Sequence, residues 1–543
     1  MLPIRYLLAG AMVVAGMVLS GVHPADARTA KPGHSAQIRK APQTKPPLRT
    51  QSKPQIQSRS LQNASRTPEK TRAPLILAEP ARTANGSLVG AVWSLPGMSD
   101  GGRNKALLLA PASTMKVFTA AAALTQLGQH FRFRTAMRSG ASPSGGVLKG
   151  DLIIDFAGDP TFSTERLLGM LDKIKEAGIK SIQGNVIINA SISNGYTRGA
   201  GWPWDDLPLC FAAPAGAVVI DHNCIITKAQ MPRGARTFSR AALTQYQPAK
   251  IVFDTQQVPK AELDQANCTL IVEPSMNNTY TVSGCIAAEK NQKKAYEQEF
   301  KFAVQDPNLW AREIIKTALR NKGIALRGNI VVSKRNPSGA VVLAESFSPE
   351  LPAMIKHMLK YSDNLFAETI AAATARSLYG QPVSIRKAAL GVKQILQQSA
   401  GVSFAGADLY DGSGLSSYSL VSADTMLQVL KYVKNNDSRL HMIELLPVSG
   451  ESGTLLRRAS VVKPPLKGQV VAKTGTIRNV RNLAGFVKSV KGNLIPFVVF
   501  HNSYYPDATE YRIMQDENKQ LPHFEYERNV LTYLYEEKTP VFR

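Results

Sequence analysis

The sequence predicts a mixed α/β (α+β) fold in which an antiparallel sheet is flanked by helices and a large insertion interrupts the main domain. Residues 483–490 and 494–500 form a hairpin pattern around Gly492 and Asn493. Residues 115–127 are rich in Ala, Leu, Phe and Val, as in a buried helix. About 470 residues follow the N-terminal segment, which is more than one hydrophobic core usually holds. The chain is therefore expected to contain more than one domain.

Hydrophobic periodicity and turn residues place the individual elements. The main domain is expected to have strands at 87–95, 106–109, 469–472, 483–490 and 494–500, and helices at 115–127, 351–360 and 365–379. The insertion is expected to have strands at 152–156, 184–188, 249–253, 269–273 and 329–332, and a helix at 164–177. Its last three strands suggest a second, mostly strand module.

Ser113 and Lys116 form an SxxK motif at the start of the helix expected at 115–127. Residues three apart share a helix face, so the amine can reach the hydroxyl. A serine is a weak nucleophile unless a base removes its proton, and a lysine serves only if burial or another cation lowers its pKa. Two further SxxK matches, at Ser384 and Ser460, lack this setting. Taken alone, the motif also fits a lysine that extends to solvent from an ordinary helix.

An SxN motif, Ser362 and Asn364, lies in a short polar break between the helices expected at 351–360 and 365–379. Such a break presents a hydroxyl and an amide to a cleft. Serine and asparagine also favour helix caps, so the motif alone has a purely structural explanation.

A KTG motif, Lys473-Thr474-Gly475, is followed by Thr476 and ends the strand expected at 469–472. Glycine would leave room for a peptide to pair with the strand edge, although a plain bulge or turn is the alternative. The three motifs in this order are typical of serine β-lactamases and penicillin-binding proteins. Together they predict an acyl-transfer site with Ser113, Lys116, Ser362, Asn364 and Lys473 as catalytic residues.

On these motifs the chain resembles the penicilloyl-serine transferase superfamily. The long insertion between SxxK and SxN is similar to that of class C low-molecular-mass penicillin-binding proteins, the D-alanyl-D-alanine carboxypeptidase/endopeptidases of the DacB type. Further matching segments, all read directly from the sequence, are Gly158-Asp159-Pro160, Gly201-Trp202-Pro203-Trp204-Asp205-Asp206, Cys210-Phe211 and Asp411-Gly412-Ser413-Gly414-Leu415-Ser416.

The resemblance implies a five-stranded antiparallel catalytic sheet in residues 84–130 plus 345–543. It also implies two nested domains in the insertion, 131–344, with about 150–245 inside 131–149 plus 246–344. We hold these boundaries as expectations.

The resemblance implies cleavage of D-alanyl-D-alanine bonds of peptidoglycan through an acyl-enzyme, without a cofactor and with β-lactams as inhibitors. Backbone amides of Ser113 and Thr476 would form the oxyanion hole. Lys473 with Thr474 and Thr476 would hold the terminal carboxylate, Gly475 would leave room for the bound peptide, and Asp206 and Phe211 would contact the stem peptide. Arg478, just beyond KTG, is a candidate cation for a second carboxylate. Asp206 is equally compatible with a surface or capping acid.

Two other functional classes remain open at this point. A serine β-lactamase would need a base for deacylation, and no clear acidic motif follows Ser362. A non-catalytic wall-binding protein would have little reason to keep all three motifs.

The N-terminal residues predict export to the periplasm. Residues 1–27 combine Arg5, an apolar run and Ala25-Asp26-Ala27, as in a signal peptide. Residues 28–80 are rich in Pro, Gln and basic side chains and are expected to be a disordered linker. Residues 28–72 supply +10 of the formal net charge of +25, which favours weak association of this linker with anionic wall polymer or a membrane surface. A merely solvated linker is the alternative. The linker lacks the interleaved aromatic residues expected of nucleic-acid binding.

Four cysteines, Cys210, Cys224, Cys268 and Cys285, lie in the insertion, and an even number in an exported chain predicts disulfides. Of three possible pairings, Cys210 with Cys224 and Cys268 with Cys285 closes the shortest loops and agrees with the resemblance. No CxxC spacing or histidine ligand pair is present, so no metal is expected.

Overall fold

The computed structural model describes residues 76–77, 87–232, 235, 237–259, 268–288, 296–338, 341–504 and 521–542. The predicted signal peptide, 1–27, lies outside the described residues. The predicted linker, 28–80, lies outside them too, except that β1 (Ile76–Leu77) pairs with β22 (Val541–Phe542). Those two residues are therefore a short strand and not disordered linker. Among the described helices, none is long and apolar enough to cross a bilayer.

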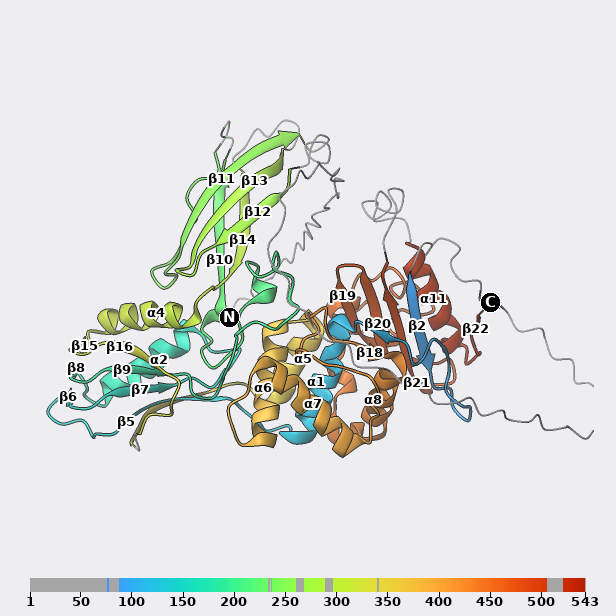
Figure 1. Cartoon of the computed structure of the whole chain (residues 1–543), viewed down its shortest axis with the longest axis horizontal. Helices are drawn as coiled ribbons and strands as arrows, with labels where there is room; N and C mark the ends of the chain where they lie inside the picture. Colours follow the sequence, from blue (N-terminus) through green and yellow to red (C-terminus); the bar gives the residue numbers. More distant parts are fainter. Residues whose placement is uncertain are drawn as a thin grey trace, which may run out of the picture. The chain divides into compact units, whose positions relative to one another are not determined.

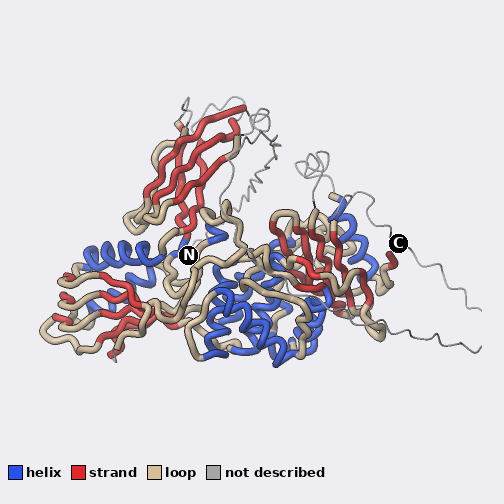
Figure 2. The backbone as a smooth tube through the Cα atoms, in the orientation of Figure 1, coloured by secondary structure: helices blue, strands red, loops and turns tan. Residues whose placement is uncertain are grey.

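A five-stranded antiparallel sheet forms one part of the main domain (Figures 1 and 2). Its order is β19 (Val470–Ile477), β20 (Val480–Lys488), β21 (Leu494–Asn502), β2 (Leu88–Trp93) and β3 (Gly101–Arg103). Side chains alternate between its faces, so that Trp93 packs under α11 (Pro522–Tyr535) while Val92 packs with the main group of helices. The sheet is thus covered on both faces.

The helical part of the main domain is built around α1 (Met115–Gln126). Every residue of α1 from Met115 to Leu124 is buried, because four consecutive alanines allow neighbouring helices to approach all sides. It packs against α5 (Leu351–Tyr361), α6 (Asn364–Tyr379), α7 (Ile385–Ala400) and α8 (Ala423–Asn435). Further short elements are β4 (Leu108–Leu109), β18 (Val421–Ser422) and α9 (Asp437–Leu440).

Two secondary-structure expectations in the main domain are wrong in detail. The strand expected at 106–109 is β4, which pairs with β18 outside the central sheet. The fifth strand of the sheet is β3, whose two glycines gave no strand signal. The strand expected to end at 472 continues to 477, since the β-branched residues after Lys473 extend the pairing with β20.

One part of the insertion is a mixed sheet with helices. Its order is β16 (Ile330–Ser333), β9 (Val186–Asn189), β7 (Leu152–Asp155), β5 (Arg134–Ser139) and β17 (Val341–Phe347). It is accompanied by α2 (Thr164–Glu176), α4 (Pro307–Lys322) and a small parallel sheet of β15 (Ala325–Leu326), β8 (Ser181–Ile182) and β6 (Val147–Leu148).

The other part of the insertion consists of strands. β10 (Cys224–Met231) pairs with β14 (Tyr296–Ala303), and β13 (Thr279–Ala288) lies between β11 (Lys250–Pro259) and β12 (Leu270–Pro274). Phe238, Phe253 and Phe300 cluster between these two sheets, with ring centroids about 5 Å apart.

Strand pairing differs from the nesting predicted for the insertion. The strand expected at 329–332 belongs with β9 and not with the later strands, and β5 pairs directly with β7. The strand module is therefore nested inside the mixed sheet, instead of 150–245 being nested inside 131–149 plus 246–344. Parallel strands such as β7 and β9 are connected by a crossover, here α2. Elements that are neighbours in sequence therefore need not be neighbours in a sheet.

Candidate active site

Ser113 lies in a 3₁₀ turn, Ala112–Thr114, that leads directly into α1. Ala112 has φ of 44°, a left-handed conformation that is costly for alanine. Such strain is typically kept where the surrounding structure enforces it, often at a functional site. The turn presents the hydroxyl of Ser113 to Lys116, whose Nζ lies 3.0 Å from Ser113 Oγ.

Lys116 is completely buried and has three polar partners. Besides Ser113 Oγ, its Nζ donates to Asn364 Oδ1 at 2.6 Å and to the Ser413 carbonyl at 2.8 Å. Burial lowers the pKa of Lys116 to about 8, although the negative charges of Asp411 and Glu368 oppose this shift. A lysine with such a pKa has an appreciable neutral fraction near pH 7 and can accept a proton from Ser113.

The SxN motif turns the chain from α5 into α6. Ser362 has φ of 59°, and Asp363 caps α6 by accepting a hydrogen bond from the Phe366 N–H. Asn364, the first residue of α6, accepts from Lys116 and donates through Nδ2 to the Phe211 carbonyl at 2.7 Å. This amide therefore connects the SxxK lysine to the insertion.

Lys473 is the second buried lysine, and its Nζ donates to Ser362 Oγ at 2.9 Å. Burial, with the positive charges of Lys116 and Arg458, holds the pKa of Lys473 well below its usual value. Thr474 Oγ1 donates to Thr454 Oγ1 at 2.9 Å. Ser113 is thus hydrogen-bonded to Lys116, and Ser362 to Lys473.

β19 lies at an edge of the central sheet, and Thr476 on it is exposed. A Cβ on Gly475 would lie 2.7 Å from the Pro111 carbonyl and 3.1 Å from Thr114 Cγ2. Glycine at this position therefore allows the turn carrying Ser113 to pack against β19. That reason differs from the predicted one, which was room for a bound peptide.

Two buried acids, Glu368 and Asp411, hold the loop that carries the Ser413 carbonyl. Glu368 accepts from the N–H groups of Gly412 and Ser413, and burial with the charge of Asp411 raises its pKa to about 8. Asp411 accepts from the N–H groups of Gly414 and Ser416 at 2.8 and 2.7 Å. From the sequence, residues 411–416 were recognised only as a segment that matches the resembling family, and no local pattern pointed to Glu368.

A loop of the insertion reaches this same group of residues. Trp202 Nε1 donates to Asp411 Oδ2 at 2.9 Å. Phe211 is about half exposed, at 47%. Burial and the charge of Asp205 raise the pKa of Asp206 to about 6, while the charge of Arg478 lowers it. Asp206 and Arg478, which lie far apart in sequence, are therefore close enough for their charges to interact.

The serines of the other two SxxK matches make hydrogen bonds that support the fold. Ser384 is the N-cap of α7 and accepts from the Lys387 N–H at 3.2 Å. Ser460 is buried and donates to Glu527, which also pairs with Arg458.

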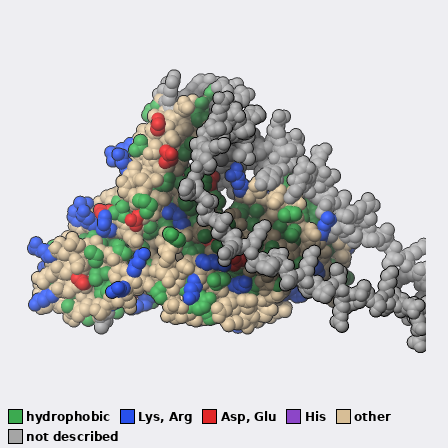
Figure 3. Space-filling view, viewed as in Figure 1, with side chains coloured by type: hydrophobic (Ala, Val, Ile, Leu, Met, Phe, Trp, Pro, Cys, Tyr) green, Lys and Arg blue, Asp and Glu red, His purple; other side chains and the backbone are tan. Residues whose placement is uncertain are grey.

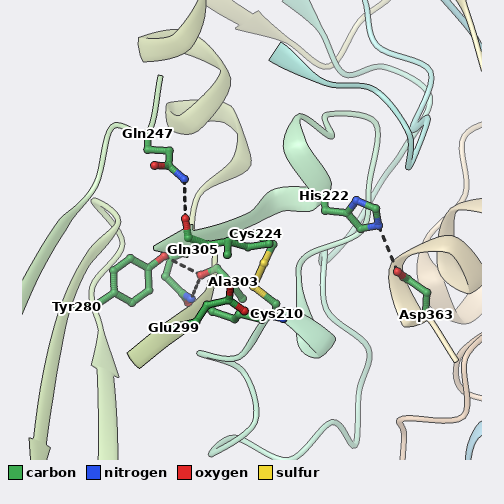
Figure 4. Close-up of a disulfide and its surroundings, with 11 residues drawn as sticks. Cys210, His222, Cys224, Gln247, Tyr280, Glu299, Ala303, Gln305 and Asp363 are labelled. Atoms are coloured by element: carbon green, nitrogen blue, oxygen red, sulfur yellow. Dashed lines mark hydrogen bonds and ion pairs between the residues drawn. A yellow bond between two sulfur atoms is a disulfide. The ribbon is translucent and has the colours of Figure 1, made fainter. Parts of the chain in front are cut away.

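The structure joins Cys210 to Cys224 and Cys268 to Cys285, the pairing expected from the sequence. Figure 4 shows the first bridge, with His222 reaching away from it toward Asp363.

Comparison with known proteins decides the family. The model of the D-Ala-D-Ala carboxypeptidase 3 (S13) family matches residues 101–522. The chain belongs to this family. It is 36% identical over 437 residues to the D-alanyl-D-alanine carboxypeptidase DacB of Haemophilus influenzae, covering 80% of this chain and 87% of that protein. It is 29% identical to a D-alanyl-D-alanine carboxypeptidase of Actinomadura sp., covering 79% and 80% of the two chains.

A solved structure also matches. Penicillin-binding protein 4 (dacB) of Haemophilus influenzae superposes with a TM-score of 0.76 at 34% identity, covering 84% of this chain and 98% of that one. The same protein complexed with a β-lactam matches with a TM-score of 0.72. The predicted family, fold class, enzyme class and D-alanyl-D-alanine carboxypeptidase function are confirmed.

Proposed function

We propose that this carboxypeptidase acts through Ser113 as nucleophile and Lys116 as its general base. The observation that carries the proposal is the 3.0 Å contact between Ser113 Oγ and the Nζ of a buried lysine whose pKa is about 8. Neutral Lys116 takes the proton as Ser113 Oγ forms a bond to the carbonyl carbon of the penultimate D-alanine.

The tetrahedral intermediate then collapses as the C–N bond to the terminal residue breaks. Backbone amides of Ser113 and Thr476 stabilise the oxyanion, and loss of one such donor costs about 10²- to 10³-fold in turnover. Ser362, hydrogen-bonded to Lys473, relays a proton to the leaving amine. Water then attacks the acyl-enzyme, so that the peptide acid is released and Ser113 regains its proton.

Lys473, Thr474 and Thr476 bind the terminal carboxylate of the substrate in this proposal. The position of β19 at a sheet edge supports it, since an extended peptide can pair there as an added strand. A β-lactam presents a similar carboxylate and carbonyl, and would acylate Ser113.

The stem peptide contacts Asp206, Phe211 and Arg478. Asp206 attracts an amine of the peptide side chain, and Arg478 attracts a second carboxylate. The same site would accept a cross-linked donor, which makes DD-endopeptidase activity on peptidoglycan its second reaction.

We place this activity in the periplasm, reached through the predicted signal peptide at 1–27. The residues expected to associate with wall polymer or membrane, 28–80, lie almost wholly outside the described ones. On the face shown in Figure 3, Lys and Arg side chains are dispersed over the described surface and not gathered into one patch.

A serine β-lactamase is the enzymatic alternative, and it requires a base that deacylates the enzyme. The two buried acids whose charges act on Lys116 are already engaged: Glu368 and Asp411 each accept hydrogen bonds from two backbone N–H groups. This arrangement favours a long-lived penicilloyl adduct. A non-catalytic wall-binding protein would form no adduct at all.

Labelled penicillin and a D-Ala-D-Ala peptide test the proposal together. The natural chain should form one adduct that persists and should release D-alanine, whereas Ser113→Ala should do neither. Ser384→Ala is the matched control and should retain both, because its hydroxyl only caps α7. Labelling that survives Ser113→Ala would refute the nucleophile, and rapid loss of the adduct would indicate a β-lactamase.

A further inference from the structure

Three side chains with metal-binding atoms converge beside the SxN motif: His222, His357 and Asp363. His222 Nε2 lies 3.2 Å from Asp363 Oδ2, and His357 Nε2 lies 3.2 Å from the same oxygen. All three atoms are within 4.8 Å of one another. Figure 4 shows His222, from the segment next to Cys224, directed at Asp363 on the main domain.

Asp363 is held in place for this role by its position at the start of α6. Its Oδ1 accepts from the Phe366 N–H at 3.2 Å, which leaves Oδ2 to face the two histidines. The Phe366 ring packs close to both imidazoles. Its centroid lies 4.4 Å from the ring centroid of His357 and 5.3 Å from that of His222. One carboxylate oxygen is thus fixed between two oriented imidazoles.

The two nitrogen–oxygen separations match those of neighbouring ligand atoms in a metal site. Zinc binds histidine nitrogen and carboxylate oxygen at about 2.0–2.2 Å in tetrahedral geometry, which puts neighbouring ligand atoms roughly 3.3 Å apart. Both observed nitrogen–oxygen distances are 3.2 Å. The side chains of His222, His357 and Asp363 are 42%, 38% and 20% exposed, so an ion can enter and a water can complete the coordination.

We propose that His222, His357 and Asp363 bind a divalent transition-metal ion, with Zn²⁺ as the ion that best suits two imidazoles and one carboxylate. The site joins the insertion to the loop between Ser362 and Asn364. A bound ion would therefore fasten the insertion to the SxN motif without touching the substrate.

No metal was expected from the sequence because no histidines have ligand spacing. His222 is 141 residues from Asp363, so only the fold brings them together. The proposal replaces that expectation.

The proposal can be tested by calorimetry. The full chain is first freed of metal and is then titrated with Zn²⁺. The natural chain should bind one ion at this site. His222→Gln and His357→Gln should each weaken that binding by at least about 100-fold, since even outer-shell partners of a metal are worth 10- to 100-fold. His130→Gln is the matched control: His130 is 92% exposed and contacts Glu350, but lies outside the cluster.

Co²⁺ titration gives an independent readout, because tetrahedral Co²⁺ has intense visible absorption bands. The bands should appear in the natural chain and in His130→Gln, and should be absent from His222→Gln and His357→Gln. Penicillin labelling of the latter two variants verifies that they are folded. The proposal is overturned if the natural chain binds no Zn²⁺, or if labelled, folded His222→Gln and His357→Gln bind it as tightly as the natural chain does.

Discussion

The preference of the enzyme for an amine-bearing substrate should depend on pH through Asp206. Burial and the charge of Asp205 raise the pKa of Asp206 to about 6, and Arg478 opposes the shift. Only the ionised carboxylate attracts an amine. With a pKa of about 6, roughly 0.9 of the carboxyl is ionised at pH 7 and roughly 0.1 at pH 5. The preference is therefore present above pH 6 and should fall by up to about tenfold as the pH decreases from 7 to 5.

The assay compares two stem peptides ending in D-Ala-D-Ala, one with a free side-chain amine and one with that amine acetylated. Their kcat/KM values are obtained from D-alanine release between pH 5 and 7.5. In the proposed mechanism Lys116 is the base for both peptides, so its protonation cancels in the ratio. The ratio then reports the pKa of the group in the free enzyme that distinguishes the amine.

Three variants give the ratio different pH profiles. Asp206→Asn should make it low and independent of pH, with a loss of about 1–3 kcal/mol in amine discrimination at pH 7. Asp205→Asn removes a like charge and should move the midpoint to lower pH. Arg478→Gln removes an opposite charge and should move it to higher pH. A flat ratio in the natural enzyme, or an unchanged pH dependence in Asp206→Asn, would refute the role given to this carboxylate.

Three other changes test the site. The rate of acylation by penicillin should fall about tenfold per pH unit below pH 8, because Lys116 must be neutral to act as base; a rate independent of pH would exclude it. Trp202→Phe removes the 2.9 Å hydrogen bond to Asp411 and should lower the free energy of unfolding in urea by about 1–3 kcal/mol, whereas no change would mean that water replaces the indole N–H. Gly475→Ala places a Cβ 2.7 Å from the Pro111 carbonyl. It should lower the free energy of unfolding by about 1–3 kcal/mol and slow acylation by penicillin. Full activity would show that the turn carrying Ser113 can move away from β19.

Local spacing predicted the parts of the site that depend on one helix or one strand. Ser113 and Lys116 are a single turn apart, so their contact follows from helix geometry. The contact between Lys473 and Ser362 spans 111 residues, and only the order of the motifs suggested it. Glu368 gave no signal because its hydrogen-bond partners are backbone N–H groups of a loop that is distant in sequence.

The insertion was harder to predict than the main domain. Hydrophobic periodicity located five of its strands, including the one at 329–332, but missed β5, β10, β13, β14 and β17 and did not give the strand partners. β16 pairs with β9 and not with a strand near it in sequence. Partner choice depends on how α2 and α4 cover the sheet, which is a property of the whole module. The two histidines near Asp363 were missed for the same reason.

The bridge between Cys210 and Cys224 encloses a ring of chain that contains both Phe211 and His222. Both of these residues contact the SxN loop, one at Asn364 and the other at Asp363. The ring therefore contacts the loop at two adjacent points. Formation of either contact raises the effective concentration of the groups that form the other. Disulfides persist under oxidising conditions, so in a reducing compartment the ring would open and the two contacts would no longer be coupled in this way. Oxidation of Cys210 and Cys224 would then strengthen the attachment of the insertion to the SxN loop.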